Sequence, residues 1–368
     1  FSHKGVLHMA KRITAALLCL GLCFGLFTGC ASQQDPAMKG WEKYTASWFD
    51  VFDTATTVIG YAESQQEWDR QMSALHEDLR QYHQLYDIYN RYSGVTNLRD
   101  VNEQAGAGPV SVDARILSML AEAQEMYTTT NGKMNIAFGA VLRLWHNYRE
   151  AAESDPAAAQ LPPMAQLQAA GEHCSIGDLI LDQAAGTVAF GDPELQLDVG
   201  SVGKGYAVEM AAQAAQARGL KSAIISVGGN LRTIGHKPDG SLWSGGIQNP
   251  WTAADPQPGQ ADPYLCAVEL EDLALVTSGN YQRYYTVDGK RYHHLIDPDT
   301  LMPAGYFSAV AVLGPDSGLA DCLSTGLFCM SLQEGQALVE SLDGVEAMWM
   351  LPDESVVYSA GFEQHLKK

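Results

Sequence analysis

The stretch of sequence that best indicates the fold is Leu195–Asn230, LQLDVGSVGKGYAVEMAAQAAQARGLKSAIISVGGN. Its first part, 195–199, alternates apolar and polar residues and predicts a strand, and its alanine-rich middle, 204–218, predicts a helix that ends at Gly219. The β-branched run 223–227 predicts a second strand. A strand, a glycine-rich turn, a helix and a strand in this order favour a domain that combines sheets with helices.

The segments on either side extend this mixed pattern. Towards the N-terminus we expect a strand or hairpin at 48–62 and amphipathic helices at 65–88 and 113–130, the second capped by Asp113. The remaining expected elements are an exposed, partly helical insert at 150–170, strands at 265–277, 283–297, 307–313 and 345–350, and a helix at 319–342. The sequence has no internal repeat and no long linker. We therefore predict one α+β domain over residues 46–366, with mixed β-sheets and flanking helices.

The composition is that of an acidic globular protein. Of 368 residues, 46% are hydrophobic and 18% are charged, which is typical of a folded domain. Lys plus Arg number 23 against 43 Asp plus Glu, and the formal net charge of −20 argues against a nucleic acid as partner. An acidic protein that binds an anionic nucleotide has to neutralise the phosphates locally, and a divalent cation is one means of doing so.

The seven cysteines form no recognisable metal or redox motif. No pair has the C-x-x-C spacing of a zinc or thioredoxin-like site, and no disulfide framework is indicated. Cys322 and Cys329 lie seven residues apart in a helical pattern, so we expect them to pack as small apolar side chains.

The N-terminal region has the pattern of an export signal. From Met9 onward, two basic residues precede the apolar run Ile13–Phe27, and small residues follow before Cys30. The apolar run is shorter than the roughly 20 residues that span a bilayer, which makes a permanent transmembrane helix the weaker alternative. We predict a signal peptide at 9–29, preceded by an upstream extension at 1–8.

The end of this signal, Phe27-Thr28-Gly29-Cys30, resembles a lipoprotein box, in which Cys30 is lipidated and becomes the new N-terminus. Phe27 stands where such boxes usually carry Leu, and an ordinary secretory signal is the alternative. The segment 30–45 fits a tether between lipid and domain. These features predict a bacterial protein that a lipid anchors to the extracytoplasmic face of the cell membrane.

Three short segments carry residues suited to chemistry. The first is the glycine-rich turn Gly200–Gly205, GSVGKG, which exposes backbone N–H and C=O groups to a close ligand. It lacks the spacing of a Walker A loop and the glycine order of a Rossmann fingerprint. A tight connection without a ligand is therefore an open alternative.

The second segment is His293–Thr300, HHLIDPDT. A histidine here can act as a general base, because the unperturbed pKa of histidine lies near neutrality. Adjacent residues of a strand point to opposite faces. We therefore expect one histidine in a site and the other in the core or in solvent, and not both on one metal ion.

The third segment is Ala320–Thr325, ADCLST, at the start of a predicted helix. Asp321 and Thr325 are four residues apart and share a face, where they offer the hard oxygen ligands that Mg²⁺ prefers. A cation there opposes the helix dipole, unless it arrives with phosphate, whose charge the dipole favours. The alternative is an N-capping aspartate with a threonine packed on the next turn.

Five motifs, taken in order, resemble those of the ApbE family of FAD:protein FMN transferases: LDVGSVGKGYAVE, IISVGGN, LVTSGNYQRYY, HHLIDPDT and ADCLSTGLF. The resemblance extends from Phe49 to Leu351. It implies a single ApbE-like domain that uses Mg²⁺ to transfer FMN from FAD to a threonine or serine hydroxyl, forming a phosphoester and releasing AMP. It also implies an acceptor that is an exported redox protein with a Ser/Thr-Gly-Ala-Ser/Thr-like segment.

The resemblance assigns roles to particular residues. It implies that His294 is the base that deprotonates the acceptor hydroxyl. Ligands of Mg²⁺ are implied at Ser201, through its backbone oxygen, and at Asp321 and Thr325. Contacts with FAD are implied at Phe52, Tyr89, Asp198, Lys204 and Leu295, with Tyr89 covering the flavin nucleotide.

The chain departs from the family pattern in two places. The family often has Gly-Ala-Phe-Asp-Pro-Thr after its second helix, whereas here Gly132 is followed by Lys133, Met134 and Asn135. We expect the FAD contact at these three residues to differ in kind, because Asn135 keeps hydrogen-bonding capacity without the charge. In the family's Asp-Pro-x-Thr-Gly, Leu301 replaces the glycine, which changes the local turn.

Two other functions remain open from the sequence. The chain could hydrolyse FAD to FMN and AMP at the same metal site, with water in place of the protein hydroxyl. It could also be a flavin-binding lipoprotein that carries the cofactor without catalysis.

Overall fold

The computed structural model describes residues 35–253 and 263–368. The predicted signal peptide, lipoprotein box and Cys30 lie outside these residues. Within them, no helix is long and apolar enough to cross a membrane. The 3-10 helix η2 (Pro36–Met38) comes first, and strand β1 begins at Glu42, so regular structure starts within the segment that we assigned to the tether.

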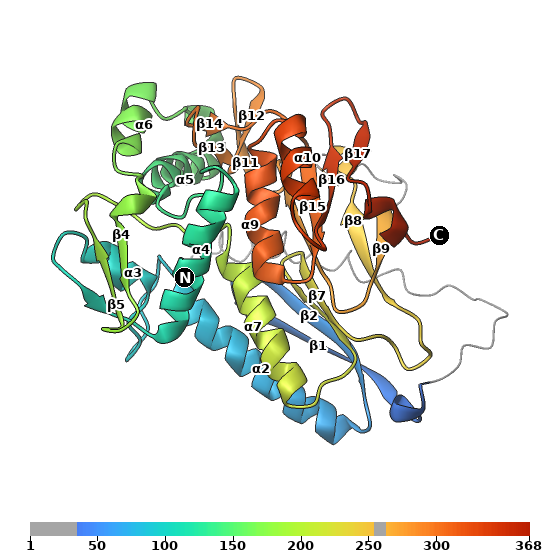
Figure 1. Cartoon of the computed structure of the whole chain (residues 1–368). Coiled ribbons are helices and arrows are strands. Elements are labelled where there is room, and N and C mark those ends of the chain that lie inside the picture. The colour runs from blue at the N-terminus through green and yellow to red at the C-terminus, as the bar shows by residue number, and fades with distance from the viewer. Residues whose placement is uncertain (1–34, 254–262) are drawn as a thin grey trace.

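The fold is built on one eight-stranded sheet with the strand order β1-β2-β6-β7-β10-β15-β16-β17, in which each neighbouring pair is antiparallel (Figure 1). Its strands are β1 (Glu42–Val51), β2 (Thr54–Ala62), β6 (Ala223–Val227), β7 (Asn230–Ile234), β10 (Ala274–Gly279), β15 (Ala309–Gly314), β16 (Glu346–Met350) and β17 (Val356–Tyr358). The predicted hairpin at 48–62 and the predicted strands at 223–227, 307–313 and 345–350 are confirmed.

Smaller sheets surround the main one. They are the three-stranded sheet of β3 (Val110–Ser111), β5 (Thr187–Phe190) and β4 (Leu179–Asp182), and the pairs β8 (Trp243–Gln248) with β9 (Tyr264–Leu270), β11 (Tyr284–Val287) with β12 (Lys290–His293), and β13 (Ile296–Asp297) with β14 (Met302–Pro303).

Helices α2, α7 and α9 lie in front of the main sheet in Figure 1, with α4 beside them. The helices are α2 (Gln65–Tyr86), α3 (Leu98–Glu103), α4 (Ala114–Thr129), α5 (Gly139–Ser154), α6 (Met164–Gly171), α7 (Gly203–Ala217), α8 (Pro250–Ala253), α9 (Ser317–Phe328) and α10 (Leu332–Glu340), with short 3-10 turns η3 (Pro156–Ala158), η4 (Ile176–Asp178) and η5 (Phe362–His365). The predictions at 65–88, 113–130 and 204–218 are confirmed. Asp113 caps α4 through the N–H of Arg115, and Gly219, with a φ of 102°, follows α7.

The central strands are apolar on both faces because both faces are covered. Val310 of β15 packs in the large core with α4, α7 and α9, and Leu313 packs on the other face with β8, β9 and Phe362. Cys322 and Cys329 are buried in the large core, as predicted. The α+β class with flanking helices is therefore confirmed, in a layered arrangement of helices, main sheet and a small second sheet.

The predicted strand at 195–199 is wrong. Only Gln196 forms a β-bridge, and the rest of the segment is extended chain. The reason is that a side chain takes the place of a neighbouring strand: Asn102 accepts the N–H of Leu197 at 2.8 Å and donates to its carbonyl at 3.0 Å. The segment leads into the glycine-rich turn, as predicted.

Three long predicted elements are each divided by a turn. A turn at Asp272, with a φ of 50°, divides 265–277 into β9 and β10. The segment 283–297 forms the β11–β12 hairpin and β13, and 319–342 forms α9 and α10, with a capping box at Ser331 between them. The ends of these strands and helices are determined by turn and cap residues, which hydrophobic periodicity does not reveal.

The insert at 150–170 is partly helical, as predicted, but it is not wholly exposed. It contains the end of α5 and most of α6, and Ala152 and Leu167 are buried in an apolar cluster with Trp145 and Ile296. Apolar residues in the strands that follow later in the chain provide this cover.

Candidate functional site

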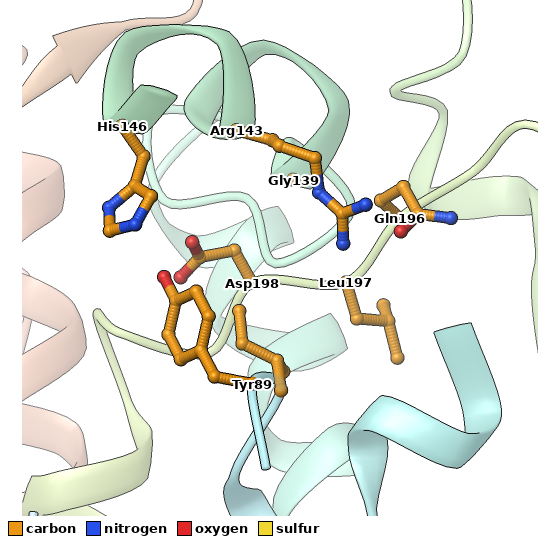
Figure 2. A pocket seen from close by; sticks show the side chains of 8 residues that line it. Tyr89, Gly139, Arg143, His146, Gln196, Leu197 and Asp198 are labelled. Carbon is orange, nitrogen blue, oxygen red and sulfur yellow. The ribbon is translucent and has the colours of Figure 1, made fainter. Parts of the chain in front are cut away.

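A small hollow lies between the α2–α3 connection, the start of α5 and the segment that precedes α7. Its lining residues are Ile88, Tyr89, Gly139, Arg143, His146, Gln196, Leu197 and Asp198 (Figure 2). Tyr89 and Asp198, which are far apart in the sequence and were both predicted to contact FAD, therefore line the same pocket.

The carboxyl group of Asp198 is buried close to positively charged side chains. Its carboxylate accepts the N–H of Gly200 at 2.9 Å, which fixes the start of the glycine-rich turn. Burial raises the pKa of Asp198, while the hydrogen bond from Gly200 and the charges of His146, Arg283 and Arg149 oppose the rise. The carboxyl group is thus prepared to form hydrogen bonds with a ligand at the end of this pocket.

Tyr89 covers the pocket from the solvent side, with 55% of its surface exposed. Figure 2 shows its phenol, the carboxylate of Asp198 and the imidazole of His146 directed toward one another, and the Tyr89 and His146 rings are 5.4 Å apart. Burial and the charge of Asp198 raise the pKa of Tyr89 to about 12, so the phenol is neutral. The hollow of about 20 Å³ has room for about one water, so the pocket has to widen before a nucleotide can enter.

Cationic side chains surround this pocket in a protein whose net charge is −20. Arg143 and Arg149 lie on α5, and Arg149 donates to Nδ1 of His146, which lies between them in the sequence, at 2.9 Å. Arg283, from the β10–β11 connection, adds its charge to the same pocket. The local field therefore favours an anionic ligand despite the overall charge.

A second group of residues lies where α7 begins beside α9. Oδ2 of Asp321 accepts the N–H of Gly205 at 2.8 Å, and only a glycine allows this approach, because a Cβ would lie 2.2 Å from the carbonyl oxygen of Ser317. Lys204 is next to this carboxylate and donates to Oδ1 of Asn230 at 2.9 Å. Burial raises the pKa of Asp321, and Lys204 together with hydrogen bonds opposes that rise.

The two other residues predicted to bind Mg²⁺ lie close in sequence to this group. Thr325 is half-buried one turn after Asp321 on the same face of α9. Ser201 immediately precedes Val202, the N-cap of α7, and the N–H of Gly205 in the first turn, which has no acceptor within the helix, donates to Asp321. In residues 35–253 and 263–368 no three His, Cys, Asp or Glu side chains are close enough to hold a metal, so a cation here would need hydroxyl, backbone and ligand oxygens besides Asp321.

His294 follows β12 and is half-buried. Its backbone N–H donates to the carbonyl of Arg283 at 3.1 Å, and its Nδ1 lies 3.2 Å from the same oxygen. Because a carbonyl can only accept, Nδ1 carries the hydrogen and Nε2 keeps a lone pair. Burial and, after it, the charge of Arg283 lower the pKa of His294 to about 3, so the ring is neutral at physiological pH.

The other histidine of the pair, His293, lies in the core, one of the two places that we expected for it. His293 is buried, its Nε2 donates to the carbonyl of Ala304 at 2.9 Å, and its Nδ1 accepts the N–H of Leu295 at 3.3 Å. Burial lowers the pKa of His293 to about 4. Its ring meets Phe328 edge-on at 5.6 Å. His293 therefore stabilises the loop, and the side chain of Leu295 is buried in the large core instead of lining the pocket of Figure 2.

The residues that depart from the family pattern lie outside that pocket. Nζ of Lys133 donates to Asp297 at 2.9 Å and to Asp299 at 2.7 Å, and although burial opposes it, these bonds raise the pKa of Lys133. Met134 is buried in the core, and Asn135 uses its side chain to bond two backbone groups. Lys133 thus fastens the loop that follows His294, and Asn135 and Asp299 line a separate hollow.

Two other predicted positions are set by turns. Leu301, at the position of the family's glycine, adopts a left-handed φ of 59°, and its carbonyl accepts the indole N–H of Trp145 at 3.0 Å. Phe52 lies in the β1–β2 turn with a φ of 54° and is not among the residues that line the pocket of Figure 2.

The arginines of α5 near this pocket were not predicted from the sequence. Arg143, His146 and Arg149 have the spacing of one helical face, but that helix was not predicted, because only part of it fell in the segment taken as an insert. Asn230 and Gly205 were read only as parts of glycine-rich turns. Their contacts with Lys204 and Asp321 depend on tertiary packing.

A pocket with arginines around it, a buried carboxylate at a helix start and a neutral imidazole are features of a protein that handles a phosphorylated ligand. The chain belongs to the ApbE family, whose sequence model matches residues 52–349. It is 33% identical over 280 residues to the FAD:protein FMN transferase of Treponema pallidum, which covers 73% of this chain and 75% of that protein. The FAD:protein FMN transferase of Klebsiella pneumoniae is 25% identical over 289 residues, covering 77% of this chain and 82% of that protein.

Solved structures share the fold. The ApbE protein of Thermotoga maritima superposes with a TM-score of 0.76 at 23% identity, covering 89% of this chain and 100% of that chain. The flavin transferase ApbE of Vibrio cholerae gives a TM-score of 0.73 at 24% identity with the same coverage.

Proposed function

We propose that this protein transfers FMN from FAD to a threonine or serine hydroxyl of another protein and releases AMP. Membership of the ApbE family and the FAD:protein FMN transferases among its relatives support the reaction. The observation that carries the proposal is the neutral imidazole of His294, with its Nε2 lone pair, near a cation-lined pocket. A hydroxyl is a poor nucleophile until such a base takes its proton.

In this reaction the acceptor hydroxyl gives its proton to Nε2 of His294 while its oxygen attacks the phosphorus nearest the flavin. The bond from that phosphorus to AMP breaks, AMP leaves with the electron pair, and the new P–O bond joins FMN to the acceptor. The Nδ1–H group of His294 keeps its hydrogen bond to the carbonyl oxygen of Arg283, and this bond stabilises the imidazolium that forms. Arg149 and Arg283 reduce the repulsion between the phosphates and this acidic protein.

We infer that Mg²⁺ binds where α7 begins beside α9. The carboxylate of Asp321, the hydroxyl of Thr325 and the backbone oxygen of Ser201 fit a hard cation. The raised pKa of Asp321 supports this inference, because a buried carboxylate gains most from a nearby cation. When bound, Mg²⁺ would neutralise the pyrophosphate and stabilise the charge that develops on the departing AMP.

We also propose that the chain is exported and anchored by a lipid on Cys30 to the extracytoplasmic face of a bacterial membrane. The pattern at 9–29 and the box that ends it support this proposal. Labelling of cells with an alkyne fatty acid should mark the wild-type chain and leave a Cys30→Ser variant unmarked. Equal labelling of the two would contradict the anchor.

The acceptor that we propose is an exported redox protein with a Ser/Thr-Gly-Ala-Ser/Thr-like segment, as the family resemblance implies. The test is to incubate the chain with FAD, Mg²⁺ and such an acceptor and to look for a flavin-fluorescent acceptor band after denaturing electrophoresis. An acceptor with the hydroxyl residue changed to alanine is the control. Free FMN and AMP without a labelled band would indicate hydrolysis, and bound but unreacted FAD would indicate a carrier; either result contradicts the transferase.

A further inference from the structure

A directed chain of hydrogen bonds connects the β1–β2 turn with the loop that carries Tyr89. The N–H of Phe52 donates to Nδ1 of His83 at 3.1 Å. Nε2 of His83 lies 3.1 Å from the hydroxyl of Tyr92, and this hydroxyl donates to Oδ2 of Asp87 at 2.7 Å. The other oxygen of Asp87 accepts the N–H of Tyr89 at 2.6 Å.

The groups at the two ends of this series of hydrogen bonds determine which group donates at each step. A backbone N–H can only donate, so Nδ1 of His83 is an acceptor and its hydrogen is on Nε2. A carboxylate can only accept, so the hydroxyl of Tyr92 donates its hydrogen bond to Asp87 and accepts the hydrogen bond from Nε2 of His83. Burial and the bond to Asp87 raise the pKa of Tyr92, which keeps that proton on the phenol.

The β1–β2 turn and the Tyr89 loop, which these hydrogen bonds connect, are both held in place by further contacts. Phe52 and Asp53 have left-handed φ values of 54° and 50°, which side-chain-bearing residues adopt only when their surroundings hold them there. The ring of Phe52 meets that of His83 edge-on at 5.4 Å. At the far end, Arg99 donates to the carbonyl of Tyr89 at 3.0 Å. Tyr89 is thus held by its backbone while its ring covers the pocket.

We propose that His83 is a positioning residue which, through Tyr92 and Asp87, fixes Tyr89 as a wall of the pocket of Figure 2. His83 is not among the pocket's lining residues, so it acts on the ligand only through the loop. This inference rests on the proposed function, because it takes FAD as the ligand that Tyr89 covers. It predicts an effect on FAD affinity and little effect on the chemical step.

Two conservative variants separate the two bonds of His83. Glutamine places an N–H near the position of Nε2 and keeps the bond to Tyr92, whereas asparagine places an acceptor near Nδ1 and keeps only the bond to Phe52. Tyr92→Phe removes the same link from the other side. If the link to Tyr92 positions Tyr89, His83→Gln should bind FAD normally and His83→Asn should not.

His76 supplies a matched control on the same helix. It is seven residues before His83 and connects α2 to strand β1, just before the turn that His83 binds: its Nε2 lies 2.9 Å from Asp50, and its ring stacks on Trp48 at 4.7 Å. Within the described residues, the hydrogen bonds, ion pair and ring contact of His76 are with Asp50 and Trp48, not with the Tyr89 loop. His76→Asn therefore reports what a purely structural loss between α2 and β1 does to FAD binding.

The experiment measures FAD binding by flavin fluorescence, steady-state transfer and thermal unfolding for the full set. We expect His83→Asn and Tyr92→Phe each to raise the FAD dissociation constant and KM about five- to ten-fold, with kcat within about two-fold of wild type. The double variant should be no worse than either single one, because both remove one link. His83→Gln and His76→Asn should bind FAD within about two-fold of wild type, whatever their melting temperatures.

An unchanged dissociation constant in His83→Asn, or an equal loss in His76→Asn, would overturn the positioning role. A wild-type chain that binds no FAD would instead refute the proposed function. The two failures are therefore distinct.

Discussion

Replacing Gly205 by alanine tests the contact between α7 and α9 most severely. A Cβ at this position would lie 2.2 Å from the carbonyl oxygen of Ser317 and 2.4 Å from Cβ of Asp321. These are backbone and near-backbone atoms, so a rotamer change cannot relieve the overlap, and the helices have to separate.

The free energy of unfolding should fall by a few kcal/mol. Forced separation of packed elements costs about 1–3 kcal/mol, and weakening the bond from the Gly205 N–H to the carboxylate of Asp321 costs about 1.5–3 kcal/mol. The higher helix propensity of alanine returns only about 1 kcal/mol. The net loss is of order 3 kcal/mol, and the displaced carboxylate should also weaken Mg²⁺ binding.

The assay is thermal and urea unfolding of Gly205→Ala, together with a Mg²⁺ titration of the transfer reaction. Gly305→Ala is the control, because a Cβ there would meet no atom within 4 Å and the glycine is not in a left-handed conformation. The variant should melt lower than wild type and need several-fold more Mg²⁺, while the control matches wild type. Wild-type stability and Mg²⁺ response in Gly205→Ala would refute the reasoning.

Three further predictions concern charge. Burial lowers the pKa of His294 to about 3, whereas the unfolded value is about 6.5, so between these pH values the unfolded chain binds more protons than the folded one. The free energy of unfolding should therefore fall as the pH falls through this window. Thermal melts should show a less steep fall in His294→Asn. Burial and, after it, the charge of Asp316 raise the pKa of Glu122 from 4.5 to about 7, so between these pH values the folded chain binds more protons than the unfolded one. The free energy of unfolding should therefore fall as the pH rises through this window. Thermal melts of Glu122→Gln should not show this fall. Arg149→Gln should raise the KM for FAD about ten-fold in steady-state transfer, because the arginine lies near the pocket. Arg80, which forms an exposed ion pair with Glu77, is the control, and Arg80→Gln should leave the KM unchanged. Equal KM values for the two variants would contradict the role of the α5 arginines.

The regular parts of the fold could be predicted because they follow local rules. The hairpin at 48–62, the α2 helix and the β6 strand each have the apolar period of their class, and Asp113 and Gly219 mark helix ends. The segment 195–199 had the period of a strand but no strand beside it. Asn102, from a helix far away in sequence, bonds its backbone, and no local pattern announces such a partner.

The site was predicted in part for the same reason. Motifs identify residues that lie close in sequence, so His294, Asp198 and Asp321 could be named, and the division of the two histidines followed from strand geometry. The field of Arg149 and Arg283 around Asp198, and the link from His83 to Asp87, arise where separate elements meet. Met134 and Leu295 were expected at FAD, and the structure places their side chains in the core.

The central claim is that the chain moves FMN to a protein hydroxyl with His294 as the base. The most direct test is to measure, in one reaction with FAD and Mg²⁺, the AMP released and the acceptor labelled, for wild type and for His294→Ala. The account predicts one labelled acceptor per AMP for wild type, and neither product for His294→Ala, although this variant binds FAD with wild-type affinity. AMP formed without labelled acceptor, or full labelling by His294→Ala, would contradict it.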